Sequence, residues 1–222
     1  MTFEEYYGES YSVLKQTEQN LLNLIREYPT DLIGAYQGKK NAEEGSEEGT
    51  KKEPEELQPI LYCKSRIKAP DSMIAKLKKQ GLQTDSATAL HKMHDAVGIR
   101  IVCSFLDDVY AAADWLCGRN ELEVLEKKDY IAWPKPNGYR SLHLILRMKE
   151  SAGPGIQAEI QIRTIAIDFW AALEHQMKYK HEVEHERLMR EELKHCADEI
   201  MSVDMSMQAI RDFIQSENGC KK

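Results

Sequence analysis

Residues 129–143 constrain the fold more than any other stretch, because they cannot form a helix or the middle of a sheet. Pro134 and Pro136 exclude a helix interior and most central strand positions, and Asn137-Gly138 favours a turn with positive φ. Basic and aromatic side chains gather in this loop, and no acidic residue follows its first position. We therefore expect the loop to bind an anionic ligand that carries a planar ring.

Two motifs connect this loop with a known family. The loop ends in Lys-Pro-Asn-Gly-Tyr-Arg-Ser-Leu-His at residues 135–143, and Glu-Ile-Gln-Ile-Arg-Thr follows at residues 159–164. Together they resemble the synthetase domain of the RelA/SpoT-type alarmone synthetases, and the short chain is similar to the small members of that family. The resemblance runs from about Arg66 to about Lys180. It implies transfer of pyrophosphate from ATP to the 3′-hydroxyl of GDP or GTP, giving AMP and the stringent-response alarmone (p)ppGpp.

Composition supports a small polyphosphate ligand. The net charge of −7 disfavours a protein that acts mainly on nucleic acid, but residues 62–80 hold six basic side chains against the single acid Asp71. A solvated basic helix is the alternative interpretation of that segment. The five cysteines show no C-x-x-C spacing, which predicts reduced thiols, and no apolar run reaches membrane-spanning length. We expect a cytoplasmic protein without a membrane partner.

Periodicity predicts four segments along the chain. They are an N-terminal helical segment (1–36), a mobile acidic and polar linker (37–57), the synthetase domain (58–181) and a C-terminal amphipathic helix (182–222). Thr2 and Glu5 predict a capping box that begins a helix over about 3–28. Apolar residues at heptad spacing from Met189 to Ile214 fit a helix docked on its own domain or an oligomer interface. The resemblance to the small synthetases, which are tetramers, favours a homotetramer.

The synthetase segment is predicted to be α/β (α+β), with a mixed β-sheet similar to the nucleotidyltransferase-like synthetase fold. Alternation predicts strands over 59–63, 95–103, 121–127, 141–148 and 156–162, with a hairpin-type turn at 151–155. Helices are predicted over 73–80, 107–116 and 164–179. Asp71 and Ser72 are expected to cap the first of these helices, and Gly81 is expected to end it.

Four basic residues predict a phosphate-binding wall. Alternation places Arg66 and Lys68 on one face of a strand, and Lys76 and Lys79 lie one turn apart on the next helix. The resemblance implies that these four bind ATP. Arg100 is the only charge inside an apolar run, so it needs a partner. That partner is either a structural carboxylate or, as the resemblance implies, the adenine ring opposite Arg66.

Two carboxylates are the candidates for chemistry. Asp95 stands at the mouth of a predicted strand, and Glu159 shares the polar face of another strand with Gln161 and Arg163. Such a polar face costs free energy unless a ligand, a metal or an ion pair uses it. Mg²⁺ prefers a few carboxylate oxygens together with phosphates and water. The resemblance implies that Asp95 and Glu159 bind Mg²⁺ and that Glu159 accepts the proton of the 3′-hydroxyl.

The resemblance also implies an acceptor site. Tyr139 would stack on the guanine ring, and Asp168 would accept hydrogen bonds from the guanine N1 and N2 hydrogens. Gln161 would orient the ribose. The phosphates of GDP or GTP would meet Lys135, Arg140 and His143.

Other motifs and functions were weighed against this one. The H-E-x-x-H pattern at 181–185 has charged neighbours and no third ligand at the usual spacing, which favours a solvated helix over a zinc site. His94-Asp95 matches a phosphohydrolase dipeptide but lacks the upstream helical domain, so we expect no alarmone hydrolysis. A non-catalytic regulator that binds guanine nucleotides or single-stranded RNA, or another metal-dependent nucleotide transferase, would use the same Tyr139 and basic wall. The acid pair favours catalysis and leaves RNA a regulatory role only, because carboxylates repel phosphate unless a metal intervenes.

Overall fold

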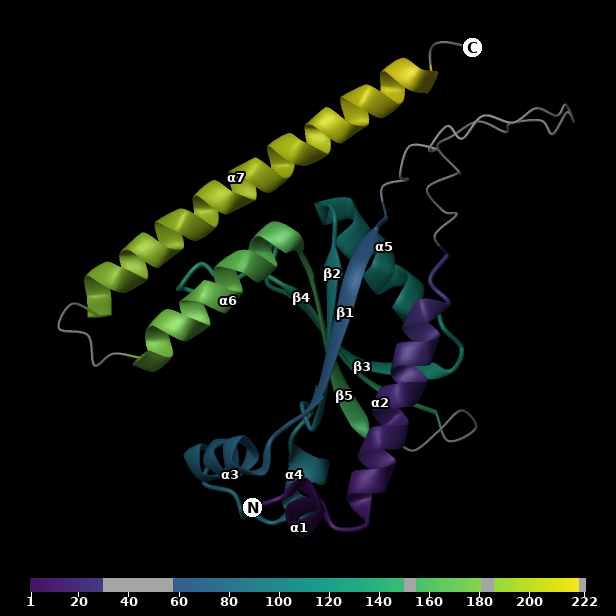
Figure 1. The fold of residues 1–222 in the computed structure, drawn as a ribbon, viewed down its shortest axis with the longest axis vertical. Coiled ribbons are helices and arrows are strands. Elements are labelled where there is room, and N and C mark those ends of the chain that lie inside the picture. The colour runs from purple at the N-terminus through teal and green to yellow at the C-terminus, as the bar shows by residue number, and fades with distance from the viewer. Residues whose placement is uncertain (30–57, 150–154, 181–185, 220–222) are drawn as a thin grey trace, which may run out of the picture.

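The computed structural model describes residues 1–29, 58–149, 155–180 and 186–219 (Figure 1). Its helices are α1 (Phe3–Tyr7), α2 (Ser10–Arg26), α3 (Pro70–Lys79), α4 (Ser86–Lys92), α5 (Leu106–Cys117), α6 (Ile165–Lys180) and α7 (Glu186–Gly219). Its strands are β1 (Ile60–Ile67), β2 (Val97–Cys103), β3 (Leu122–Asp129), β4 (Leu142–Met148) and β5 (Gln157–Thr164). The predicted linker over 37–57, the turn at 151–154 and the H-E-x-x-H pattern lie outside the described residues.

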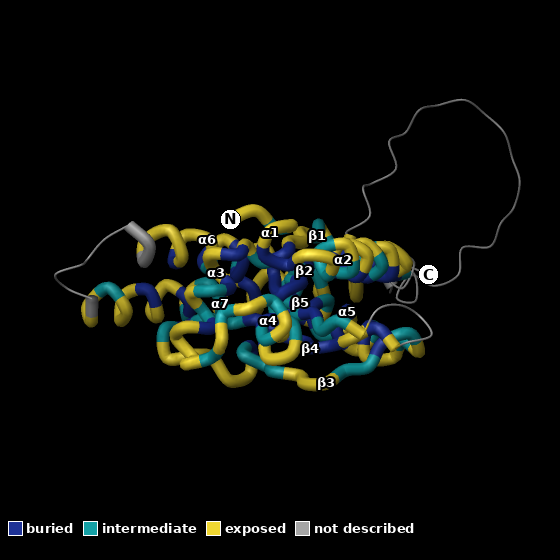
Figure 2. The backbone as a smooth tube through the Cα atoms, turned by 90° about the horizontal axis from the view of Figure 1, so that it is seen from below, coloured by how far each residue is buried: buried dark blue, intermediate teal, exposed yellow. Residues whose placement is uncertain are grey.

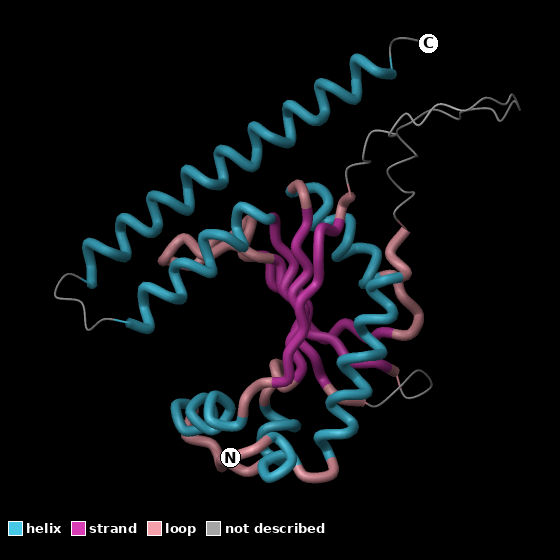
Figure 3. Tube along the Cα trace, viewed as in Figure 1, coloured by secondary structure: helices cyan, strands magenta, loops and turns pink. Residues whose placement is uncertain are grey.

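The strands form one five-stranded mixed sheet in the order β1-β2-β5-β4-β3. β2 and β5 are parallel, and the other neighbours are antiparallel. In Figure 1, α2 and α5 lie on one side of the sheet, whereas α6 and α7 lie toward the other. Figure 3 shows the twist of the strands between these helices. The predicted α/β fold is confirmed, with α4 as a helix that the sequence pattern did not indicate.

The core fills the space between the sheet and the helices, and Figure 2 shows the buried positions concentrated along the strands. Ala158, Ile160 and Ile162 of β5 are each 0% exposed, while Glu159 and Gln161 between them are half-buried. This alternation was predicted, and it follows from the two-residue period of a strand whose faces have different environments. The apolar residues of β5 therefore pack into the core, and its polar residues face a second, ligand-accessible side.

The N-terminal segment is two helices rather than the single helix predicted over 3–28. Gly8 ends α1 with φ +56°, a conformation that favours glycine, and α2 begins at Ser10. The capping box is present, because Thr2 Oγ1 accepts from the Glu5 amide and Glu5 accepts from the Thr2 amide. The break turns α1 so that the Tyr7 hydroxyl donates to the Lys68 carbonyl at 2.8 Å. The N-terminus therefore supports a residue of the predicted phosphate wall.

The predicted cap of α3 is wrong. α3 begins at Pro70 after Ala69, which makes no side-chain cap, and Asp71 lies inside the first turn. Proline suits this first position because its fixed φ is helical and its missing N–H has no partner there anyway. Gly81 ends the helix as predicted, with φ +69° and a hydrogen bond from the Leu82 amide to the Leu77 carbonyl at 3.0 Å.

α7 docks with one half and projects with the other. Leu193 and Ala197 are buried against α6, where the Trp170 indole donates to the Leu193 carbonyl at 2.9 Å. Further along, the Thr164 hydroxyl donates to the buried Asp204 carboxylate at 2.5 Å. Four residues of the predicted heptad pattern are more than half exposed, namely Val203, Met207, Ile210 and Ile214. No helix within the described ranges combines the length and the apolar character that a membrane span requires.

Candidate functional site

Strand register aligns the chemical side chains in two rows across the sheet. One row joins Arg66 of β1 to Gly98 of β2, and Gly98 to Glu159 of β5. The neighbouring row runs across all five strands in the order Lys64, Arg100, Gln161, His143 and Lys128. Residues two apart on a strand share a face, so both rows lie on the same side of the sheet. The register therefore gathers basic and acidic residues that are far apart in the sequence.

These rows border a cleft of about 240 Å³. It is lined by Lys64, Ser65, Arg66, Asp95, Gly98, Ile99, Arg100, Glu159 and Gln161. A larger cavity of about 380 Å³ lies between α2 and β1, but Arg26 is the only charged residue of its described lining. The smaller cleft is the candidate site because it contains both predicted catalytic carboxylates and two of the predicted ATP-binding arginines.

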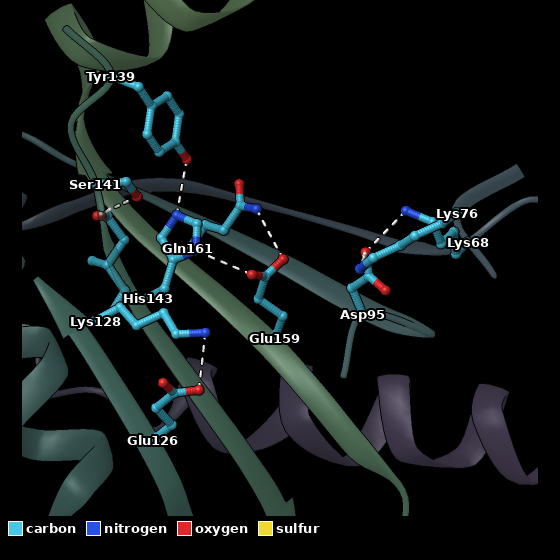
Figure 4. Close-up of polar contacts among 11 residues, drawn as sticks. Lys68, Lys76, Asp95, Glu126, Lys128, Tyr139, Ser141, His143, Glu159 and Gln161 are labelled. Atoms are coloured by element: carbon cyan, nitrogen blue, oxygen red, sulfur yellow. Dashed lines mark hydrogen bonds and ion pairs between the residues drawn. The ribbon is translucent and has the colours of Figure 1, made fainter. Parts of the chain in front are cut away.

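Asp95 is held by two lysines at one end of the cleft (Figure 4). Its Oδ2 lies 2.9 Å from Lys68 Nζ and 2.8 Å from Lys76 Nζ. Burial raises the pKa of Asp95, but the hydrogen bonds and charges of Lys76 and Lys68 outweigh it, so the net pKa falls below its usual value. Asp95 is therefore a carboxylate at neutral pH, and the two ammonium groups are held at the cleft wall.

The other predicted ATP ligands occupy different positions. Arg66 lines the cleft, and a Cβ built on Gly98 would lie 3.7 Å from Arg66 Cγ, so glycine leaves this space open. Arg100 also lines the cleft, and its Nη1 lies 3.2 Å from Asp168 Oδ1. Lys79 is exposed on α3 and is not among the described residues that line the cleft. Its role in ATP binding stays a prediction.

Glu159 belongs to a hydrogen-bonded chain on β4 and β5 (Figure 4). His143 Nδ1 lies 3.0 Å from Glu159 Oε1, and the Tyr139 hydroxyl lies 2.9 Å from His143 Nε2. Gln161 Nε2 donates to Glu159 Oε2 at 3.1 Å. Burial raises the pKa of Glu159, but the hydrogen bond and charge of His143 and the hydrogen bond from Gln161 lower it further than burial raises it. Glu159 is thus ionised, oriented, and able to accept a proton inside the cleft.

Tyr139 is the centre of an aromatic cluster. Its ring packs edge-on against Tyr130, with centroids 6.2 Å apart, and against His143 at 5.8 Å. Lys135 Nζ lies 5.0 Å from the centroid of the Tyr139 ring and 4.5 Å from that of Tyr130. A planar base that stacks on Tyr139 would exchange a cation–π contact for a ring contact. Tyr130 was not identified from the sequence.

Arg140 and Asp168, two predicted acceptor ligands, are bound to protein groups. Arg140 Nη2 donates to Asp198 of α7 at 2.8 Å and Nη1 donates to the Ile131 carbonyl at 3.1 Å. Asp168 is 6% exposed and accepts from the Tyr62 hydroxyl at 2.9 Å and from Arg100 at 3.2 Å. The buried Arg163 completes this group, with its Nε 3.1 Å from Asp168 Oδ1. Their contacts with guanine or phosphate remain predictions, since each would require these bonds to rearrange.

The carboxylates fit a shared metal better than a closed protein cage. Asp95 Oδ1 is buried and has no hydrogen-bond partner among the described residues, so one oxygen is available to a cation. Glu159 shares the cleft lining with Asp95. Within the described ranges, no cluster of three or more His, Cys, Asp or Glu side chains is arranged to hold a metal. Mg²⁺ commonly binds through one or two carboxylates plus substrate phosphates, which suits this donor set.

Sequence reasoning missed residues whose position depends on strand pairing. Lys64 lies opposite Arg100, and Lys128 lies opposite His143, so both enter the polar row through register alone. Tyr62 reaches Asp168 across more than a hundred positions of sequence. Lys64 and Arg66 do alternate on β1, which is a signal that could have added Lys64 to the predicted wall.

Comparisons with known proteins agree with this geometry. Residues 65–184 match the model described as a region found in RelA / SpoT proteins. GTP pyrophosphokinase YwaC of Bacillus subtilis is 41% identical over 156 residues, covering 69% of this chain and 74% of that protein. GTP pyrophosphokinase YjbM of the same organism is 31% identical over 160 residues, covering 71% of this chain and 74% of that protein.

A solved structure shares the fold as well. The small alarmone synthetase 1 of Bacillus subtilis, bound to its product pppGpp, matches with a TM-score of 0.71 and 26% identity over 91% of this chain and 95% of that one. The motif at 135–143, the motif at 159–164 and the mixed sheet that joins them are thus shared with alarmone synthetases. The chain belongs to the RelA/SpoT family.

Proposed function

We propose that the cleft between β1, β2 and β5 transfers pyrophosphate from ATP to the 3′-hydroxyl of GDP or GTP, giving AMP and (p)ppGpp. Family membership and the two GTP pyrophosphokinases that cover most of the chain support this activity. The single observation that carries it is the placement of Glu159, which lies in the same cleft as the basic residues and is linked by His143 to Tyr139. One carboxylate therefore adjoins both the predicted ATP site and the predicted guanine site.

The proposed mechanism is an in-line displacement at the β-phosphorus of ATP. Arg66, Lys68 and Lys76 neutralise the triphosphate, and Tyr139 stacks on guanine so that the ribose lies beside Glu159. The 3′-oxygen forms a bond to the β-phosphorus while the bond from that phosphorus to the α,β-bridging oxygen breaks. Glu159 accepts the hydroxyl proton, and AMP leaves with the bridging oxygen. Gln161 and His143 hold the carboxylate in the orientation that this transfer requires.

Mg²⁺ is the proposed cofactor, with Asp95 Oδ1 and Glu159 as its protein ligands. When bound, the ion would stabilise the negative charge that develops on the β-phosphoryl oxygens. The free Asp95 oxygen supports this assignment, because a buried carboxylate oxygen without a partner is costly in the absence of a cation.

The activity is tested by incubating the protein with ATP, Mg²⁺ and either GDP or GTP and separating the nucleotides by anion exchange. We expect equal amounts of AMP and of a guanosine nucleotide that has gained two phosphates. Controls without acceptor, with adenosine nucleotide as acceptor, and with excess EDTA should give neither product. Tight binding of guanine nucleotide without AMP would instead support the alternative of a non-catalytic binding regulator.

The exposed apolar residues of α7 support self-association in the cytoplasm, which we propose gives a homotetramer. Val203, Met207, Ile210 and Ile214 leave an apolar stripe on the projecting half of the helix, and a second copy of α7 would cover it. Ile210→Asp would place a charge in that stripe, and light scattering should then report a smaller particle. Glu199→Asp, a conservative change on the same helix, is the control and should leave the particle mass unchanged. An unchanged mass for Ile210→Asp would reject this interface.

A further inference from the structure

The loop that carries Tyr139 has its own internal order. Residues 130–141 connect β3 to β4, and the Lys135 amide donates to the Tyr139 carbonyl at 3.1 Å, while the Gly138 amide donates to the Lys135 carbonyl at 2.8 Å. At its start, Asp129 Oδ1 accepts from the Ile131 and Ala132 amides. These bonds fix the shape of the loop, but they do not fix its position over the sheet.

Its position is determined by α7. A Cβ built on Gly138 would lie 2.7 Å from Ala197 Cβ and 3.1 Å from Lys194 Cα, so the loop backbone rests directly on the helix. Gly138 is buried and has φ +86°, which adds a conformational reason for glycine. The contact uses the docked half of α7, next to Leu193, where Trp170 joins α6 to α7.

An ion pair fastens the same loop one residue beyond Tyr139. Arg140 is 14% exposed at its side chain, and its two terminal nitrogens bond to Asp198 and to the Ile131 carbonyl. Asp198 is held in turn by Lys194, with Oδ2 and Nζ 2.7 Å apart. A planar guanidinium bonded at two points has little freedom, so the backbone next to the Tyr139 ring is held as well.

We propose that Asp198 is a positioning residue for the guanine nucleotide: through Arg140 it holds the 131–140 loop against α7 so that Tyr139 faces the cleft. The proposal rests on the function given above and assigns Arg140 an architectural partner in place of a phosphate. Because Lys68, Lys76 and Asp95 contact neither α7 nor this loop in the bonds described above, loss of Asp198 should affect the acceptor and leave ATP binding unchanged.

The test compares Asp198→Ala with Asp198→Glu and with Glu191→Ala in the full chain. Glu191 is the matched control, since it forms an exposed ion pair with Arg187 on the same helix. We expect Asp198→Ala to raise the KM for GDP about tenfold while the KM for ATP changes less than about twofold. Asp198→Glu should recover most of the loss, and Glu191→Ala should behave as the unmodified protein. Equal changes in both KM values, or none, would overturn the proposal.

Amide hydrogen exchange gives a readout that does not depend on catalysis. Exchange at Lys135 and Gly138 should be faster in Asp198→Ala and unchanged in Glu191→Ala, with similar thermal midpoints for the two variants. If the unmodified protein forms no AMP, the proposed function fails, and the exchange data together with a GDP binding titration still decide the role of Asp198. If exchange in the loop is unaffected, the positioning role is rejected even for an active enzyme.

Discussion

The two sides of the cleft are built in different ways. On the ATP side, Lys68, Lys76 and Asp95 come from neighbouring parts of the sequence and bond to one another. On the guanine side, Tyr139 and Arg140 come from one loop but depend on contacts with α7. The comparison teaches that nearby sequence can assemble a charged wall, whereas a stacking surface for a base is oriented by a helix from the far end of the chain.

The largest expected effect lies at the boundary of the two sides. Glu159→Gln keeps the size of the side chain but removes the base, so kcat should fall by roughly 10²–10⁴-fold with small changes in both KM values. Glu126→Gln, which alters a glutamate paired with Lys128 on β3, is the control and should retain activity. Steady-state AMP formation measures both. A Glu159→Gln enzyme with more than about a tenth of the normal kcat would remove Glu159 from its catalytic role.

The next effect separates the ring of Tyr139 from its hydroxyl. Tyr139→Ala removes a stacking surface worth about 1–3 kcal/mol, so the KM for GDP should rise about 10- to 100-fold. Tyr139→Phe keeps the ring and loses only the 2.9 Å contact with His143, so its KM should change far less. If both variants lose the same affinity, hydrogen bonding rather than stacking would be the source of guanine binding.

A third effect concerns pH. The hydrogen bond and charge of His143 help to lower the pKa of Glu159, whereas burial raises it. His143→Leu removes the lowering contribution and leaves burial, so the pKa of Glu159 should rise. The acidic limb of the kcat profile should then move to higher pH, because the base must be ionised to accept a proton. A limb at the same pH as in the unmodified enzyme would show that Glu159 does not set it.

The smallest effect is on stability, and it belongs to the ATP side. The pKa of Asp95 in the folded chain lies below its ordinary value of 3.8 because Lys76 and Lys68 outweigh burial. The stabilisation is therefore complete above about pH 4 and is lost as pH falls through the lower, folded pKa. Asp95→Asn should cost about 1–2 kcal/mol at pH 7, discounted for the partly exposed Lys76. Urea unfolding should show this difference shrinking in acid; a constant difference would exclude an ionic origin.

The sequence was sufficient for much of this site, and the reason is local geometry. Alternation on β5 placed Glu159 and Gln161 on one face, and helix spacing placed Lys76 within reach of the strand that carries Asp95. The motif at 135–143 located the guanine loop. These signals depend on the periods of a strand and a helix, which a short window of sequence reveals.

The remainder depended on contacts that no local pattern contains. Arg140 carries a charge suited to phosphate, yet its partner is Asp198 on a helix whose docking face could not be predicted from heptad spacing alone. Asp168 looked available on the first turns of α6, but Tyr62, Arg100 and Arg163 meet there only because β1, β2 and β5 are adjacent. The break at Gly8 likewise required a positive φ that a sequence with helical periodicity does not announce.

The most direct test of the two-sided cleft is a comparison of four Michaelis constants. The KM values for ATP and for GDP are measured in Lys76→Ala and in Tyr139→Ala, with each substrate varied at saturation of the other. The account predicts that Lys76→Ala raises only the KM for ATP and that Tyr139→Ala raises only the KM for GDP. Variants that raise both constants by the same factor would contradict it, because a shared effect would mean that the two nucleotides do not bind to separate sides of the cleft.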